Sequence, residues 1–272
     1  MNKVFESYRN IHGGERVFLI ANGPSLSETD LSLIENEYSF AMNRISMIYD
    51  KFPIWRPTYY LFSSTNVRPG KPWAKQWQES VIRASTEEKT TPFIARLFKP
   101  YIDPNDKIPS IKWFDSMSET KPAIDGSISK NCFSKNVIDR IDKSGTTMNL
   151  ALQLVYYMGF SEVVFLGADL GWKLDKGTSS DPNHFDSSYV ADISKPEKAN
   201  NQMRNIHSLA LRNFNDSQKG TIFYNASKKT VLDVYPIIDF EEYMKGNIVY
   251  RDDDFKSAQQ YWSQPPQFQG GI

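Results

Sequence analysis

The chain has 272 residues, enough for one large domain with a well-buried core or for one domain with a small lobe. Lys plus Arg and Asp plus Glu each number 32, so no overall basic field would draw the protein to nucleic acid, and any anion site must be local. Cys132 is the only cysteine, which excludes an intramolecular disulfide and a cysteine-cluster metal site. Because no long apolar run occurs, the sequence predicts a cytoplasmic protein without a membrane span; peripheral membrane contact and homo-oligomer formation stay open.

The first clear element is an apolar run of strand length at residues 16–21, which ends abruptly in Asn22-Gly23-Pro24-Ser25. Such runs are typical of central parallel strands that are covered on both faces. Ser25 with Glu28 matches a capping box, which predicts a helix starting near Ser25 or a few residues later. The pattern therefore predicts a strand, a tight turn and a helix.

Strands and helices then alternate along the chain. The expected elements are a strand at 38–42, a short helix at 45–49, a strand at 58–62 and a helix at 73–84. Residues 85–143 contain several prolines, with strands expected only at 92–96 and 111–114. We expect this region to form a lid or an irregular lobe.

Clear signals return after residue 143. Ser144-Gly145-Thr146-Thr147 is expected to open a helix that Gly159 closes, and a buried strand over 162–166 is expected to stop at Gly167-Ala168-Asp169. The remaining expectations are a polar loop at 173–195 that forms a second lid or acceptor-side insertion, a helix at 196–214 begun by Ser194, a strand at 221–224 and a fraying polar tail at 252–272.

This alternation predicts the α/β class, with one Rossmann-like catalytic domain over 1–251 built on a mostly parallel sheet with helices on both faces. Ligands in such sheets bind outside the carboxyl ends of the strands. The polar residues at the strand ends should therefore converge on one site. They are Asn22 to Ser25, Asn43, Ser63, Ser64, Asp169 and Asn225.

The turn Asn22-Gly23-Pro24-Ser25 joins a strand to a helix, so its free backbone amides and the helix dipole favour a phosphate or carboxylate. Gly23 permits a close backbone approach and Pro24 stiffens the turn. The alternative is a plain turn in which Ser25 only caps the helix. Neither a P-loop kinase nor a dehydrogenase with the Gly-x-Gly-x-x-Gly fingerprint is supported, because both motifs are missing here.

Two further positions can carry chemistry. Gly145, Thr146 and Thr147 form a hydroxyl-rich helix start that could hold a phosphate or sugar hydroxyls, or could simply cap the helix. Asp169, with Gly167 and Ala168 before it, could bind a sugar hydroxyl, act as a base or ligate a metal. Its alternative role is to brace the following loop.

Only three histidines occur. His12 is expected to be exposed and His207 to be packed in or on its helix, which leaves His184 in the 173–195 loop as the candidate general base or acid. A Ser-His-Asp hydrolase is disfavoured because no Gly-x-Ser-x-Gly elbow is present. The run Asp252-Asp253-Asp254 is expected to be a solvated tail, and no metal site is predicted.

The order of four short motifs resembles a known family. The motifs are Asn22-Gly23-Pro24-Ser25-Leu26, Met42-Asn43-Arg44, Gly145-Thr146-Thr147 and Phe165-Leu166-Gly167-Ala168-Asp169. The family joins the bacterial sialyltransferases of glycosyltransferase family 42 with 6-hydroxymethylpterin diphosphokinase-like proteins of surface-glycan loci. This chain departs from the sialyltransferase pattern at Ala21, at Ser63-Ser64 and at Gly171-Trp172.

The resemblance implies a glycosyltransferase that moves sialic acid or a related sugar from a CMP-activated donor to a bacterial surface glycan, such as a lipopolysaccharide or capsule. It implies that Asn22, Gly23, Pro24, Ser25 and Asn43 hold the nucleotide. The remaining donor contacts would be Ser63, Ser64, Gly145, Thr146, Thr147, Gly167, Ala168 and Trp172. His184 would be the base with Asp169 as the second catalytic residue, and no cofactor would be required. The alternatives are an ATP- and Mg-dependent diphosphokinase and a non-catalytic nucleotide-binding module.

Overall fold

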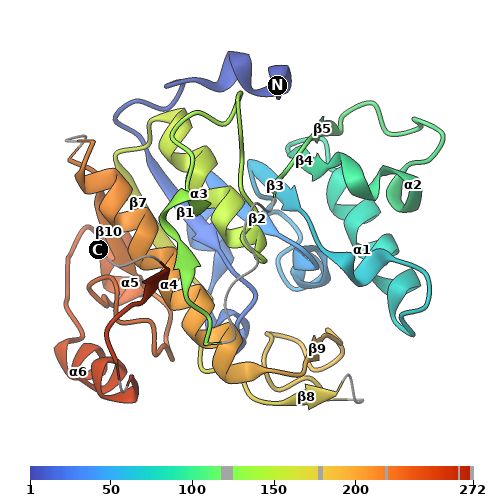
Figure 1. The fold of residues 1–272 in the computed structure, drawn as a ribbon. Helices are drawn as coiled ribbons and strands as arrows, with labels where there is room; N and C mark the ends of the chain where they lie inside the picture. Colours follow the sequence, from blue (N-terminus) through green and yellow to red (C-terminus); the bar gives the residue numbers. More distant parts are fainter. Residues whose placement is uncertain (118–124, 177–179, 218–219, 263, 270–272) are drawn as a thin grey trace.

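A seven-stranded parallel sheet forms the centre of the described part of the chain (Figure 1). The computed structural model describes all residues except 118–124, 177–179, 218–219, 263 and 270–272. The strand order is β10-β7-β1-β2-β3-β4-β5, and every neighbouring pair is parallel. The strands are β1 (Arg16–Ile20), β2 (Ser39–Met42), β3 (Tyr59–Phe62), β4 (Thr91–Ala95), β5 (Lys112–Phe114), β7 (Glu162–Leu166) and β10 (Ile222–Asn225). The predicted α/β class with a mostly parallel sheet is confirmed.

The central strands are apolar because both faces of the sheet are covered. Val17 to Ile20 of β1 and Val163 to Leu166 of β7 are fully buried, as expected for parallel strands. In the register of the sheet, Ile20 lies beside Leu166 on one side and Ala41 on the other. The turns that follow β1, β2 and β7 therefore leave the sheet at the same level.

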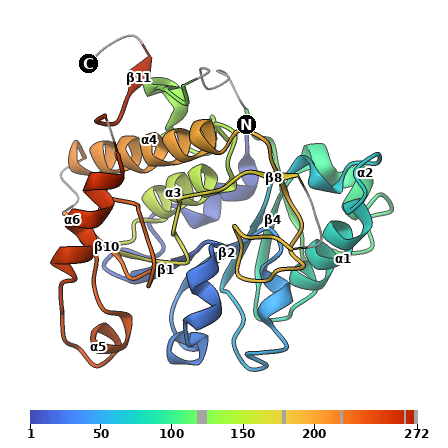
Figure 2. The same cartoon turned by 90° about the horizontal axis from the view of Figure 1, so that it is seen from below.

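Helices cover both faces of the sheet, as predicted. Figure 2 shows α3 (Thr147–Met158) and α4 (Pro196–Asn215) on one face and the short helices η2 (Pro24–Glu28), η3 (Leu31–Ile34) and η4 (Ile45–Ile48) on the other. Helix α1 (Ala74–Ser85) packs beside η4, where the Ser46 hydroxyl donates to the Ser80 carbonyl at 2.8 Å. Gly159 ends α3 in the left-handed conformation, at φ 85°.

Smaller elements complete the described chain. They are η1 (Lys3–Tyr8), η5 (Thr65–Val67), η6 (Arg96–Phe98), α2 (Lys99–Ile102), β6 (Ile128–Ser129), η7 (Lys130–Cys132), β8 (Asp175–Lys176), β9 (Asp192–Ile193), α5 (Phe240–Met244), α6 (Asp252–Tyr261) and β11 (Phe268–Gln269). Among the residues that the structure describes, no helix combines the length and the apolar character that a bilayer crossing requires.

Two predicted helix caps are wrong, although helices begin at Pro24 and at Pro196, close to where they were expected. Residues 24–28 form a short 3-10 helix rather than an α-helix capped by Ser25, because the Ser25 side chain bonds to Asp169 across the sheet edge. Helix α4 begins after Lys195, which makes no side-chain capping bond, so Ser194 is not its cap. At Ser25, a contact with a residue remote in sequence replaces the expected capping bond. At α4, the residue before the helix makes no side-chain capping bond.

The region 85–143 is only partly irregular. Strands β4 and β5 lie within it and extend the central sheet, and Phe93 and Ile94 of β4 are fully buried. These two strands, expected at 92–96 and 111–114, therefore belong to the sheet, where β4 pairs with β3 and β5 pairs with β4. A lid formed by the rest of the region stays a prediction. Residues 118–124 of the predicted lid and 177–179 of the predicted 173–195 insertion lie outside the described residues.

The prediction of a fraying tail from residue 252 is wrong. Asp252, Asp253 and Asp254 form the first turn of α6, where acidic side chains complement the helix dipole. Beyond it, the Trp262 indole donates to the Val231 carbonyl at 2.7 Å, and β11 pairs in parallel with β6. Residues 263 and 270–272 of this segment lie outside the described residues. Specific contacts thus hold the rest of the segment against the domain.

Candidate functional site

A cavity of about 300 Å³ opens at the carboxyl ends of the strands. The turns after β1, β2 and β7 line it, and the first turn of α3 and the first half of α4 close it. The chain runs from β1 outward to β5 and then returns to β7 on the other side of β1. The cavity therefore lies where the strand order reverses, which is where open parallel sheets bind their ligands.

The turn after β1 is held tightly against the turn after β7. The Gly23 amide donates to the Gly167 carbonyl at 2.9 Å, and the Ser25 amide and hydroxyl both donate to the carboxylate of Asp169, the amide at 2.7 Å. A Cβ atom on Gly23 would lie 2.5 Å from the Gly167 carbonyl oxygen and 2.6 Å from Asp169 Oδ2. Only glycine fits this position.

Asp169 braces the turn. Both carboxylate oxygens are engaged by Ser25, and burial raises the pKa of Asp169 to about 6 although the bonds from Ser25 act in the opposite direction. These contacts favour the bracing role among the alternatives, and a catalytic role for Asp169 stays a prediction. Pro24 and Ser25 do not line the cavity, whereas Gly23 and Asp169 do.

The first turn of α3 supplies a second set of donors. Gly145, Thr146 and Thr147 line the cavity, and the opening turn of a helix carries amides without intrahelical partners. The Thr146 hydroxyl accepts from the Met148 amide and therefore caps the helix, which was one of the two roles expected for this helix start. The Thr147 hydroxyl donates to Asn43 Oδ1 at 3.2 Å and joins the turn after β2 to this helix start.

Lys143 places a positive charge in the cavity wall just before this helix start, and the sequence analysis missed it. Burial, together with the charge of Arg68, lowers the pKa of Lys143 to about 8. No carboxylate of the described residues pairs with it; its ammonium group lies 5.6 Å from the centre of the Phe98 ring. A buried cation without an acidic partner is suited to an anionic ligand. A lysine preceding a small-residue helix start is the signal that could have identified it.

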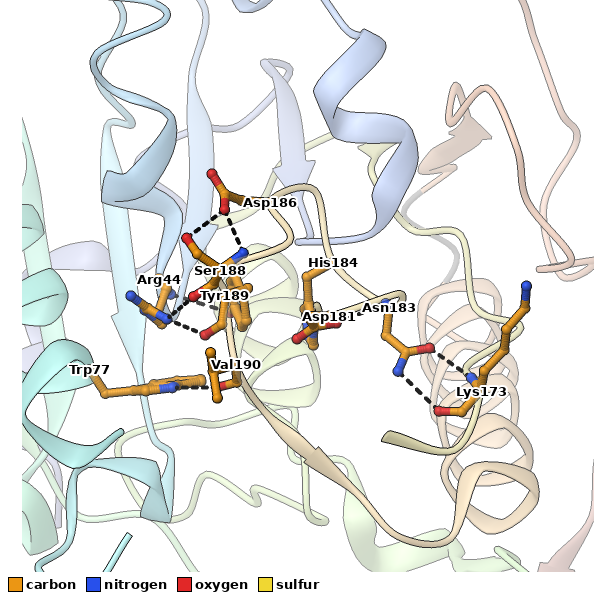
Figure 3. A network of polar contacts seen from close by, with 10 residues as sticks. All are labelled: Arg44, Trp77, Lys173, Asp181, Asn183, His184, Asp186, Ser188, Tyr189 and Val190. Carbon is orange, nitrogen blue, oxygen red and sulfur yellow. Dashed lines mark hydrogen bonds and ion pairs between the residues drawn. The ribbon is translucent and has the colours of Figure 1, made fainter. Parts of the chain in front are cut away.

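His184 also lines the cavity and is held by two neighbours (Figure 3). Its Nδ1 lies 2.8 Å from Oδ2 of Asp181, whose side chain is fully buried. A carboxylate can only accept, so Nδ1 donates and Nε2 is left as the basic nitrogen. The imidazole also stacks on the Tyr189 ring, with centroids 3.9 Å apart and planes inclined by 4°. This is the geometry of an oriented general base.

The loop that carries His184 is fastened to the sheet edge at several points (Figure 3). The Arg44 guanidinium donates to the carbonyls of Ser188 and Tyr189, and the Trp77 indole donates to the Val190 carbonyl at 3.0 Å. Val190 has a φ of 51°, a costly conformation for a β-branched residue. A further bond, from the Phe185 amide to the Asn22 carbonyl at 3.0 Å, ties this loop to the turn after β1.

Two buried polar atoms in the cavity wall have no hydrogen-bond partner among the residues that the structure describes. They are Oδ1 of Asn22, whose side-chain nitrogen donates to the Met42 carbonyl, and the hydroxyl oxygen of Ser63. Leaving such groups unpaired costs about 1–3 kcal/mol each, so they mark positions where a ligand can supply the missing partner.

The cavity brings together every predicted site residue except Pro24 and Ser25. Asn225 is also not in the wall; its side chain bonds to Thr230 and to the Ser227 amide. The sequence analysis missed other lining residues from outside the strand ends. Those that matter below are Lys143, Trp77, Tyr189, Met203 and His207. In the described chain, no three His, Cys, Asp or Glu side chains are grouped so that they could hold a metal ion.

The expected exposure of His12 is wrong. It is buried, stacks on Phe160 with centroids 4.4 Å apart and bonds to the Tyr59 hydroxyl. Of the two positions expected for His207, packed or on the surface, the structure shows the packed one, and the residue also reaches the cavity.

No protein-family model and no curated protein matches the chain. Among solved structures, it is similar to the sialyltransferase CstII from Campylobacter jejuni in complex with a substrate analogue, cytidine-5'-monophosphate, at 14% identity and a TM-score of 0.42, over 82% of this chain and 84% of that chain. A variant of the sialyltransferase Cst-II in complex with CMP gives 15% identity and a TM-score of 0.40, over 81% of this chain and 84% of that chain. Likeness at this level assigns neither a function nor site residues.

Proposed function

We propose that the chain is a glycosyltransferase that moves a sugar from a nucleotide-activated donor to a hydroxyl of a glycan acceptor. The observation that carries the proposal is that one cavity combines an oriented imidazole, His184 on Asp181, with a site for an anion at the start of α3. Transfer of a sugar from a nucleotide requires both, because a hydroxyl must lose a proton while a phosphate departs with its charge.

The donor phosphate would lie at the first turn of α3. The amides of this turn and the positive end of the helix dipole attract an anion, and Lys143 adds a full charge. The same groups would stabilise the negative charge that develops as the sugar leaves the phosphate. Asn43 would contact the same part of the donor, which is supported by the hydrogen bond that joins it to Thr147 of this turn.

His184 would act on the acceptor. Its Nε2 takes the proton of the acceptor hydroxyl, the oxygen attacks the anomeric carbon of the sugar, and the bond from that carbon to the phosphate oxygen breaks. Asp181 keeps Nδ1 protonated and stabilises the imidazolium that forms. Asp169 and Gly23 would act indirectly, by fixing the turn that places Asn22.

The choice of a CMP-linked donor, with sialic acid or a related sugar, rests on the motif order described above. The same resemblance supports a surface glycan of a bacterium as the acceptor. An anionic donor and a general base are supported by the cavity itself, whichever nucleotide carries the sugar.

The first test is a thermal-shift screen of CMP, CDP, UDP, GDP and ATP, each with Mg²⁺ and with EDTA. A ligand at about 100 times its dissociation constant adds roughly 2.7 kcal/mol to the free energy of unfolding. We expect CMP or CDP to stabilise the protein in EDTA, and the corresponding sugar nucleotide to be turned over with a glycan acceptor. Stabilisation by ATP only with Mg²⁺ would replace the proposal with the diphosphokinase. Tight binding without turnover across a panel of acceptors would indicate a non-catalytic module.

A further inference from the structure

Helix α4 presents one row of side chains to the cavity. Ala199, Met203 and His207 are spaced four residues apart, so they lie on one face of the helix, and all three line the cavity. Burial increases along the row: Ala199 is half-buried, Met203 is 8% exposed and His207 is 1% exposed. His207 therefore lies at the inner end of the cavity, where the mechanism above gives it no role.

The hydrogen bonds of His207 fix which ring nitrogen faces a ligand. The Tyr235 hydroxyl donates its one hydrogen to the His207 carbonyl oxygen at 3.2 Å. In the second contact between the two residues, also 3.2 Å, Nδ1 must then donate to the hydroxyl oxygen. Nε2 is consequently left with a free lone pair. Burial lowers the pKa of His207 to about 3, so the ring stays neutral and Nε2 stays an acceptor.

The cavity that His207 lines can take a flat and largely apolar group, because Met148, Leu170 and Met203 supply apolar wall to it. The unpaired Oδ1 of Asn22 is a second buried acceptor in the same cavity. Its orientation is fixed because the Asn22 side-chain nitrogen donates to the Met42 carbonyl, which can only accept. A ligand that satisfies both atoms must offer hydrogen-bond donors.

We propose that His207 binds the nucleobase of the donor and selects a base with an exocyclic amino group, cytosine or adenine, over the corresponding keto base, uracil or hypoxanthine. The inference rests on the proposed function, because it requires a nucleotide in the cavity. An exocyclic amino group carries two N–H bonds and no lone pair that opposes Nε2. In the keto base a carbonyl oxygen takes its place, and two acceptors then face each other.

The test is isothermal titration with two matched pairs of nucleotides, CMP against UMP and AMP against IMP. Within each pair the phosphate and ribose are identical and the amino group is replaced by a keto group. In the pair whose ring size fits the cavity, we expect the amino base to bind at least tenfold more tightly to the wild-type protein. His207→Met should abolish this preference by weakening the amino base alone, and His207→Gln, which keeps an acceptor near the position of Nε2, should retain part of it.

Tyr235→Phe gives an independent variant outside the cavity. It removes the hydroxyl that fixes the tautomer of His207, so the preference should fall while the binding of the keto base stays unchanged. Circular dichroism would show which variants fold, and a wild-type protein without the preference overturns the inference even if none does. Equal affinity within both pairs, or tighter binding of a keto base, would overturn the inference and leave the proposed function standing. Failure of all four nucleotides to bind would overturn both.

Discussion

Gly23→Ala should destabilise the protein and remove nucleotide binding together. The added Cβ would lie 2.5 Å from the Gly167 carbonyl oxygen and 2.6 Å from Asp169 Oδ2, and neither atom can retreat freely because both bond to the turn that carries Gly23. Overpacking typically costs about 1–3 kcal/mol, and a lost bond to the Asp169 carboxylate costs about 1.5–3 kcal/mol more. At roughly 2–4 °C per kcal/mol, the melting temperature should fall by about 5–24 °C.

Gly13→Ala is the matched control. A Cβ at Gly13 would meet only the Asn10 carbonyl oxygen, at an ordinary 3.7 Å, so this variant should melt within about 2 °C of the wild type. Differential scanning calorimetry gives both values, and titration with the best nucleotide of the screen gives the binding. If Gly23→Ala melts with the control and still binds the nucleotide, the close packing of the two turns does not constrain the site as described.

Three further predictions address the charges of the cavity. Because the pKa of Lys143 is lowered to about 8 and only its protonated form attracts an anion, nucleotide affinity should fall above pH 8; Lys143→Met should remove this dependence, whereas Lys75→Met on the exposed face of α1 should leave it intact in the same titrations. His184→Ala should lower the rate of sugar transfer about 10²-fold or more while changing nucleotide affinity less than threefold; a transfer rate within threefold of the wild type would contradict the assignment of the base. The pKa of Asp169 is raised to about 6, so the folded protein holds this proton more tightly than the unfolded chain, and the stability that it gives is complete below about pH 4 and lost by about pH 6. Urea unfolding should show the wild type losing about 3 kcal/mol relative to Asp169→Asn between pH 4 and pH 7; parallel curves would mean that Asp169 is not desolvated.

Sequence patterns located the cavity because its walls are strand ends. An apolar run that stops at small polar residues marks the carboxyl edge of a buried strand, and the topology of a parallel sheet brings such edges together. For this reason Asn22, Asn43, Ser63 and Gly167 could be assigned to one site from local signals. The helix start at Gly145 to Thr147 was recognisable in the same way.

The roles of individual side chains depended on contacts that local patterns do not contain. Ser25 satisfies the local rule for a helix cap, yet its donors go to Asp169, which is 144 residues away. His12 lies in a polar segment but stacks on Phe160, which is remote in sequence and directly precedes β7, the strand beside β1. Lys143 is a candidate for binding an anion because the fold places it in the cavity wall, and no carboxylate of the described residues pairs with it. Each of these outcomes is set by tertiary packing rather than by neighbouring residues.

The hydrogen bond from the Phe185 amide to the Asn22 carbonyl connects the loop that carries His184 to the turn after β1. It joins the residue after His184 to the turn that would hold the nucleotide, with no intervening side chain. Substitutions in the two segments should therefore be energetically coupled, and their effects on catalysis should fail to add, since residues that share a hydrogen-bond network typically show coupling energies of about 0.5–3 kcal/mol. A double-mutant cycle across this bond would measure how strongly an occupied donor site governs the position of the base.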